Sequence, residues 1–226
     1  EGVDVNDKYL GCGTLTGDMK LIADQRTDLG FPDLYMACDV YYLENVKQWF
    51  QEEAIISETE IILAVPSGSE KVASLGDLTK PGIRVAIGEP EQCTIGALTR
   101  RLLVDEGLYD TLREKQRSHG EVVVEFDSSA NLVPQVVPIG TETPADVAVA
   151  YITDGQSNAD RVDVRHIDSA LNKAVQPIAI AKSSMQKHLA RRLMQRIIDS
   201  PEVIEAAGFR SRVGEKQNDD DTATEE

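Results

Sequence analysis

The sequence has little of what marks several large classes of protein. It has three cysteines, three histidines and one tryptophan in 226 residues, and 23 basic residues stand against 39 acidic ones. So few and scattered cysteines exclude a disulfide framework. A net charge of −16 argues against nucleic-acid binding, which needs a basic surface. No apolar run approaches the roughly 18 residues of a membrane-spanning helix, so we expect no membrane span.

What remains is the composition of a folded protein with alternating strands and helices. Hydrophobic residues make up 41% of the chain. The apolar runs that we expect to be strands are residues 2–11, 31–39, 61–65, 83–88, 122–126, 146–151, 162–166 and 178–181. The amphipathic segments that we expect to be helices are residues 14–23, 40–53, 95–106, 187–198 and 201–208. This alternation predicts an α/β fold with mostly parallel sheets.

The elements fall into two sets, which predicts two lobes. We expect residues 1–65 and 176–212 to form lobe 1 and residues 66–175 to form lobe 2, with chain crossings near Val65 and Gln176. The last residues, 213–226, lack the apolar side chains that a core needs, and six acids and one base crowd into positions 215–226. We expect this segment to be a disordered acidic tail.

Three loops share one design, in which a strand ends, small residues follow and a helix begins. They are residues 9–15, 88–96 and 126–133. Each directs the unpaired N–H groups of a helix, and the positive end of its dipole, towards one point. Each also carries thiols or hydroxyls there: Cys12, Thr14, Cys93, Thr94, Ser128 and Ser129. Simple N-capping accounts for any one loop. Three such loops in one short chain could surround an anion without lysine or arginine, although their spacing in the sequence does not bring them together.

The sequence resembles the periplasmic molybdate-binding proteins, the substrate-binding components of molybdate ABC transporters. The resemblance runs from residue 1 to about 212 and is carried by EGVDVNDKYLGCGTL, PDLYMACDVYYLENV, IILAVPSGSEKV, IRVAIGEPEQCTIGALTRRL, AYITDG and VQPIAIAKSS. It implies a two-lobed periplasmic binding protein of type II, in which each lobe is a mixed, mostly parallel sheet flanked by helices. The implied function is the capture of molybdate or tungstate for a cognate ABC permease, without catalysis, cofactor or metal.

The resemblance also implies a set of anion donors. The donors carried over are Cys12, the main-chain amides of Ile95 and Ser129, and Tyr151, which closes over the anion. Cys38, Cys93 and Thr94 are further candidates for the cleft, because all three cysteines fall where a strand meets a helix. The thiols leave two alternatives open, three inert buried cysteines or a thiol-lined site for a softer, thiophilic ligand. Pairing of two cysteines is a third alternative.

Two departures from the family pattern affect these expectations. The family's first strand and its donor loop have no counterpart here, so we expect an N-terminal strand to be missing. In addition, Cys12 stands where the family usually has serine, and a thiol is a weaker donor than a hydroxyl. The implied location is periplasmic or otherwise extracytoplasmic, with a lipid anchor as one form of attachment, although no leader is visible in this chain.

Two other classes of function compete with a binding protein. One is the effector-sensing domain of a transcription regulator, which has the same two-lobed fold but needs an attached helix-turn-helix. The other is a thiol enzyme with Cys93 as nucleophile, its pKa depressed by the start of a helix. The sequence offers no evident base for this enzyme.

Overall fold

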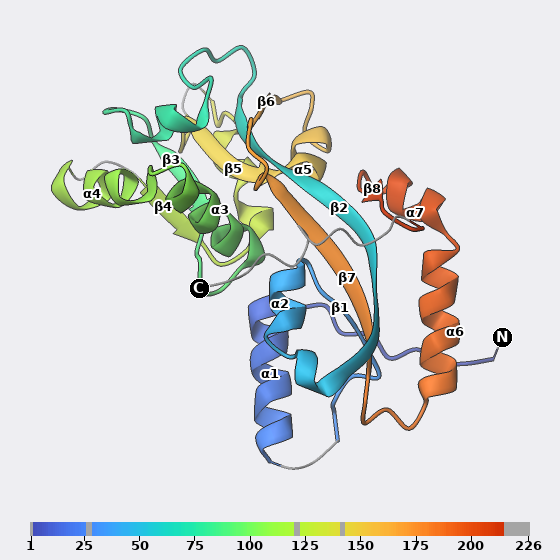
Figure 1. The fold of residues 1–226 in the computed structure, drawn as a ribbon. Helices are drawn as coiled ribbons and strands as arrows, with labels where there is room; N and C mark the ends of the chain where they lie inside the picture. The colour runs from blue at the N-terminus through green and yellow to red at the C-terminus, as the bar shows by residue number, and fades with distance from the viewer. Residues whose placement is uncertain (1, 26–28, 120–122, 141–142, 215–226) are drawn as a thin grey trace.

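One mixed sheet runs through the protein, and helices cover both of its faces (Figure 1). The computed structural model describes residues 2–25, 29–119, 123–140 and 143–214. The strands are β1 (Leu34–Met36), β2 (Phe50–Pro66), β3 (Val85–Gly88), β4 (Val123–Phe126), β5 (Val147–Tyr151), β6 (Val162–His166), β7 (Lys173–Ala181) and β8 (Arg210–Ser211). Their order in the sheet is β1-β7-β2-β5-β3-β4, and β6 and β8 also pair with β2.

The helices lie between these strands along the chain. They are α1 (Cys12–Asp24), α2 (Val40–Glu44), α3 (Thr94–Asp105), α4 (Tyr109–His119), α5 (Ile152–Gln156), α6 (Lys187–Ile198) and α7 (Pro201–Ala206). Short 3₁₀ helices are η1 (Lys47–Trp49), η2 (Leu75–Thr79), η3 (Ser129–Asn131) and η4 (Val133–Val136). In the part of the chain that the structure describes, no helix is long and apolar enough to cross a membrane.

The 17-residue strand β2 connects the two halves of the sheet. Its first part pairs with β7, from Phe50 opposite Ala181 to Glu60 opposite Lys173. Its last part pairs with β5 and β6. Two register shifts between Gln51 and Ser57 interrupt the ladder with β7. Such irregularities bend a strand and increase its twist, so a single strand can serve both halves.

The first half of the sheet is covered on both faces, as the alternation of side chains along β7 shows. Ile180 packs with Met194 of α6 in one apolar cluster. The next residue, Ala181, packs with Met19 of α1 in another. Successive side chains of a strand point to opposite faces, so α1 and α6 lie on opposite sides of the sheet (Figure 1).

The second half of the sheet has a larger core. The end of β2 buries Ile62 and Leu63 completely, and α3 buries Leu102 and Leu103 against the same cluster. Ile95 and Leu98 of α3 also belong to this cluster, so one apolar face of the helix predicted over residues 95–106 is buried here. The periodicity of α3 and α6 predicted both helices to within two residues.

Pairing in the sheet differs from the expectation of mostly parallel strands. The fold class, a mixed sheet with flanking helices, is confirmed, but among the described strands five pairings are antiparallel and only those of β3 with β4 and β5 are parallel. The reason is the long strand β2, which meets each of its four neighbours antiparallel. Four of the five antiparallel pairings therefore involve this one strand.

Two predicted elements are wrong. Residues 2–11 form no strand and are exposed throughout. No described strand lies alongside them, and an isolated extended segment leaves its main-chain groups to water. The helix predicted over residues 40–53 ends at Glu44, because Phe50 already pairs with Ala181 in the sheet. Sheet pairing overrides helix propensity there.

Two expectations about domain organisation remain predictions. The lobe boundaries near Val65 and Gln176 stay predictions. Positions 215–226 of the predicted tail lie outside the described residues. At the start of that segment, the N–H of Val213 donates to Oγ of Ser211, 3.4 Å away.

Candidate functional site

Two of the three predicted loops meet, although they lie about 80 residues apart in the sequence. The evidence is the close approach of α1 to the loop before α3. A Cβ atom added at Gly13 would lie 3.2 Å from the carbonyl oxygen of Gln92 and 3.3 Å from that of Glu91. One added at Gly11 would lie 3.6 Å from the oxygen of Gln92. The first turns of α1 and α3 therefore face the same region.

Glycines shape the turn from β3 into α3. A Cβ atom at Gly88 would lie 2.6 Å from the main-chain nitrogen of Gly96, and one at Gly96 would lie 2.4 Å from the oxygen of Glu89. No other residue type fits at either position. The tight turn places Ile95, which is 1% exposed, in the first turn of α3. Amides in a first turn have no intrahelical acceptor, so the Ile95 amide is available to an anion.

Cys12 and Cys38 form the centre of the site. The main-chain N–H of Cys38 donates to Sγ of Cys12 at 3.1 Å, and α1 thereby contacts the segment between β1 and α2. Cys12 is 1% exposed, whereas Cys38 is exposed. The interaction of the Cys38 side chain with that of Cys12 is the main reason that the pKa of Cys12 falls to about 7. The same interaction raises the pKa of Cys38.

Three tyrosines surround the thiols. They are Tyr35 on β1, Tyr42 on α2 and Tyr151 at the end of β5. Burial is the main cause that raises the pKa of each, and the charge of Cys12 contributes to all three. The hydroxyl oxygens of Tyr35 and Tyr151 are buried without a hydrogen-bond partner. Buried polar atoms are almost always paired, so these two hydroxyls are orphans that a bound acceptor would satisfy.

The third predicted loop, residues 126–133, contacts the second loop, residues 88–96. Phe126 ends β4, and its carbonyl oxygen accepts a hydrogen bond from the N–H of Glu89 at 2.7 Å and from Sγ of Cys93 at 3.4 Å. Ser129 follows three residues later, half-buried at the start of η3. This places Ser129 beside the turn into α3. Its part as a donor stays a prediction.

Comparison with known proteins identifies the family. The sequence profile of the bacterial extracellular solute-binding proteins matches residues 17–210. The chain belongs to this family. It is 25% identical to the molybdate-binding protein ModA of Mycobacterium bovis over 215 residues, which span 92% of this chain and 74% of that protein.

Solved structures agree on the fold of this solute-binding protein. The periplasmic molybdate-binding protein of Azotobacter vinelandii is similar with a TM-score of 0.66 at 18% identity, covering 92% of this chain and 87% of that one. The substrate-binding domain of a putative molybdenum ABC transporter from Clostridium difficile gives 0.64 at 19% identity, covering 92% and 86%. At these identities the likeness concerns the fold alone.

Membership of this family favours a binding protein over the two other classes of function. The pKa of Cys93 also differs from the thiol-enzyme expectation, because burial raises it where the sequence predicted a depressed one. Within the described residues, no group of three His, Cys, Asp or Glu side chains is placed to hold a metal ion.

Asp39 is a residue of the site region that sequence reasoning missed. It is 2% exposed, and its carboxylate accepts hydrogen bonds from the N–H groups of Tyr41 and Val175, each at 2.9 Å. The first bond caps α2, and the second ties α2 to β7. The sequence signal that could have identified Asp39 is its position directly before a short helix, where Asp is a common N-cap residue. Burial raises its pKa despite the two bonds.

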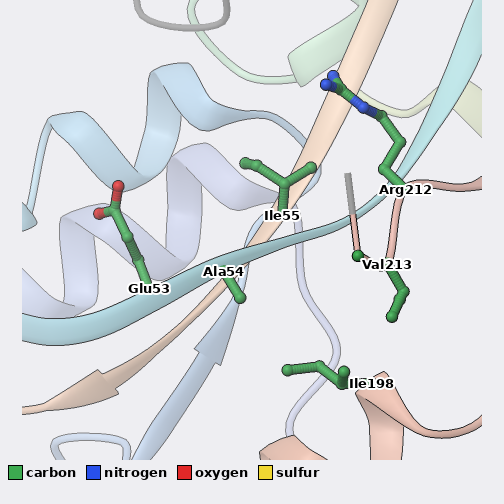
Figure 2. A pocket seen from close by; sticks show the side chains of 7 residues that line it. Glu53, Ala54, Ile55, Ile198, Arg212 and Val213 are labelled. Atoms are coloured by element: carbon green, nitrogen blue, oxygen red, sulfur yellow. The ribbon is translucent and has the colours of Figure 1, made fainter. Parts of the chain in front are cut away.

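A pocket of about 210 Å³ lies elsewhere, on the face of the first half of the sheet that α6 covers. It is lined by Glu53, Ala54, Ile55, Ile198, Arg212, Val213 and Gly214 (Figure 2). Glu53 and Arg212 lie at opposite ends of it. None of the predicted donors lines it. The cysteine and tyrosine cluster, and not this pocket, remains the candidate site.

Proposed function

We propose that this solute-binding protein captures a tetrahedral oxyanion, molybdate or tungstate, and delivers it to the permease of an ABC importer. The molybdate-binding relatives support this class of ligand. The observation that carries the proposal is the meeting of residues 9–15 and 88–96, which sets the N-termini of α1 and α3 against one region. Two helix N-termini at one point favour an anion between them.

The proposed donors are Cys12, the amides of Ile95 and Ser129, and the hydroxyl of Tyr151. All four are uncharged when they donate, so they bind the anion through fixed dipoles. Such donors need no rearrangement when the anion enters, and their hydrogen bonds to it are charge-assisted. The orphan hydroxyl of Tyr151 supports this assignment, because an anion would give it the acceptor that it lacks.

The lobes proposed are residues 1–65 with 176–212 and residues 66–175, closing on the anion from two sides. The close contact of Gly13 with Gln92, one residue from each lobe, is what a closed state requires. We propose an extracytoplasmic location, free in the periplasm or held at the membrane by a lipid, from which the loaded protein docks on its permease.

Isothermal titration calorimetry tests the ligand. The protein is titrated with molybdate, tungstate, sulfate and cadmium, the last as a thiophilic ion, under reducing conditions. We expect one-to-one binding of molybdate and tungstate and no cadmium uptake. The bound anion should also stabilise the folded protein, by about 2.7 kcal/mol at a ligand concentration of 100 times Kd. Absence of heat with both oxyanions in a protein shown to be folded by circular dichroism would disprove the proposal.

A further inference from the structure

Cys12 and Cys38 lie in the arrangement that a disulfide needs. Sγ of Cys12 accepts a hydrogen bond from the main-chain N–H of Cys38, with 3.1 Å between sulfur and nitrogen, and the interaction between the two side chains shifts the pKa of both thiols. Since N and Cα of one residue are about 1.46 Å apart, Sγ of Cys12 lies at most about 4.6 Å from Cα of Cys38, which is within the reach of a bridge between the two side chains. We propose that these two thiols form a reversible disulfide that switches the anion site off.

The chemistry of the surroundings supports a reactive pair. Cys38 is exposed and open to an oxidant, whereas Cys12 is buried behind it. The hydroxyl of Tyr35, a residue only 4% exposed, lies beside Cys12, and its interaction with the sulfur contributes to the lowered pKa of Cys12. A donor at this position favours a thiolate over a thiol on Cys12. A thiolate is the form that reacts with disulfides.

The oxidant is a small-molecule disulfide, RSSR, and the reaction is two thiol–disulfide exchanges. The pair carries one negative charge once Cys12 has given its proton to water, and this charge moves to the exposed Cys38 when Cys12 takes the proton of Cys38. Cys38 then attacks RSSR, which gives a mixed disulfide and releases RS⁻. The released thiolate takes the proton from Cys12, and Cys12 attacks the sulfur of Cys38. The second RS⁻ leaves with a proton from water, so two thiols and RSSR become one protein disulfide and two RSH.

The bridge removes a donor from the proposed anion site. Bridged Cys12 has no S–H to donate, and its sulfur is drawn towards Cys38. Loss of one hydrogen bond to a charged ligand lowers affinity about ten- to a hundred-fold. This consequence rests on the proposed function, whereas formation of the disulfide does not. Cys93 takes no part, because its thiol already donates to the carbonyl oxygens of Glu89 and Phe126.

The test compares the whole protein with its Cys38→Ser and Cys93→Ser variants in oxidised and reduced glutathione mixtures. Tryptic mass spectrometry reads the bridge as a link between the peptides 9–20 and 27–47, lighter by two hydrogens. We expect this link in the unmodified protein and in Cys93→Ser, and none in Cys38→Ser. Calorimetry with molybdate on the same samples should show the ten- to hundred-fold loss on oxidation only in the two linked proteins, with recovery on reduction.

Each other outcome has a definite meaning. A link to Cys93, a stable glutathione adduct on Cys38 without a bridge, or no reaction overturns the disulfide. A correct link with unchanged molybdate affinity overturns the switch. If the reduced protein binds no molybdate and the link still forms, the proposed function fails, the switch falls with it, and the disulfide stands.

Discussion

Replacing Tyr151 with phenylalanine should stabilise the protein and weaken its binding of the anion at the same time. The ring of Tyr151 packs against the larger core, and its hydroxyl oxygen is buried without a partner. Tyr151→Phe keeps the ring and removes only that oxygen. The two effects have opposite signs because the hydroxyl lacks an acceptor in this structure and would gain one in the complex.

The magnitudes follow from the cost of an unmade hydrogen bond. A buried polar group without a partner costs about 1–3 kcal/mol, so we expect the unliganded variant to be more stable by about 1 kcal/mol. A hydrogen bond to a charged acceptor contributes about 1.5–3 kcal/mol, so affinity for molybdate should fall roughly ten- to a hundred-fold. Urea unfolding without ligand measures the first effect, and calorimetric titration measures the second.

Thr99→Val is the matched control. Thr99 lies on α3, is 1% exposed, and its hydroxyl oxygen is also buried without a partner. It lies one helical turn beyond Ile95 on α3 and is not itself a proposed donor. This variant should gain stability and keep its affinity. The reasoning about Tyr151 is refuted if Tyr151→Phe binds molybdate within twofold of the unmodified protein, or if it loses stability as well as affinity.

Four further predictions concern Ser129, Lys115, Lys47 and Cys12. Ser129→Pro should lower molybdate affinity about ten- to a hundred-fold in calorimetry, because it removes an amide donor, whereas Ser129→Ala should leave it nearly unchanged. Lys115 is 6% exposed and donates to three main-chain oxygens between residues 78 and 83, so Lys115→Met should lower the free energy of unfolding by about 3 kcal/mol in urea titrations. Lys47→Met breaks an exposed ion pair and should cost less than about 1 kcal/mol. Molybdate affinity should fall as pH rises through the pKa of Cys12, about 7, because the thiolate repels the anion, by at most about tenfold per pH unit; Cys12→Ser should remove this dependence.

The fold was predictable where a single element buries one regular face. Helix α6 begins and ends at the expected residues, and β6 matches residues 162–166. The failures lie where pairing with distant strands decides the structure. The chain after Glu44 turns into β2 because β7, more than 100 residues later, offers it a partner. The local sequence pattern of residues 40–53 does not indicate this pairing with β7.

The site was predictable as a set of loops but not as an arrangement. Helix starts rich in small residues indicated where N–H groups would be free, and two of those loops do meet. The sequence placed all three cysteines at junctions, but it did not show that Cys12 contacts Cys38 while Cys93 bonds elsewhere. Tyr35 was missed because a buried strand tyrosine gives no local signal. Its place in the candidate site became visible only from the structure, where its buried hydroxyl oxygen has no hydrogen-bond partner.

The charge of the protein explains why the proposed site uses neutral donors near a titrating thiol. A net charge of −16 opposes the approach of an anion, but salt at physiological strength screens this repulsion beyond about 8 Å. Inside that distance the fixed dipoles of α1 and α3 decide whether the anion stays. Every proposed donor is neutral, so a single new negative charge among them cancels much of the attraction that the helix dipoles exert on the anion. Cys12 is the proposed donor whose pKa lies near neutrality, so its thiolate adds that charge, and its oxidation removes the donor altogether. Proton and electron transfer at one sulfur would thus both act on the affinity of this site for its anion.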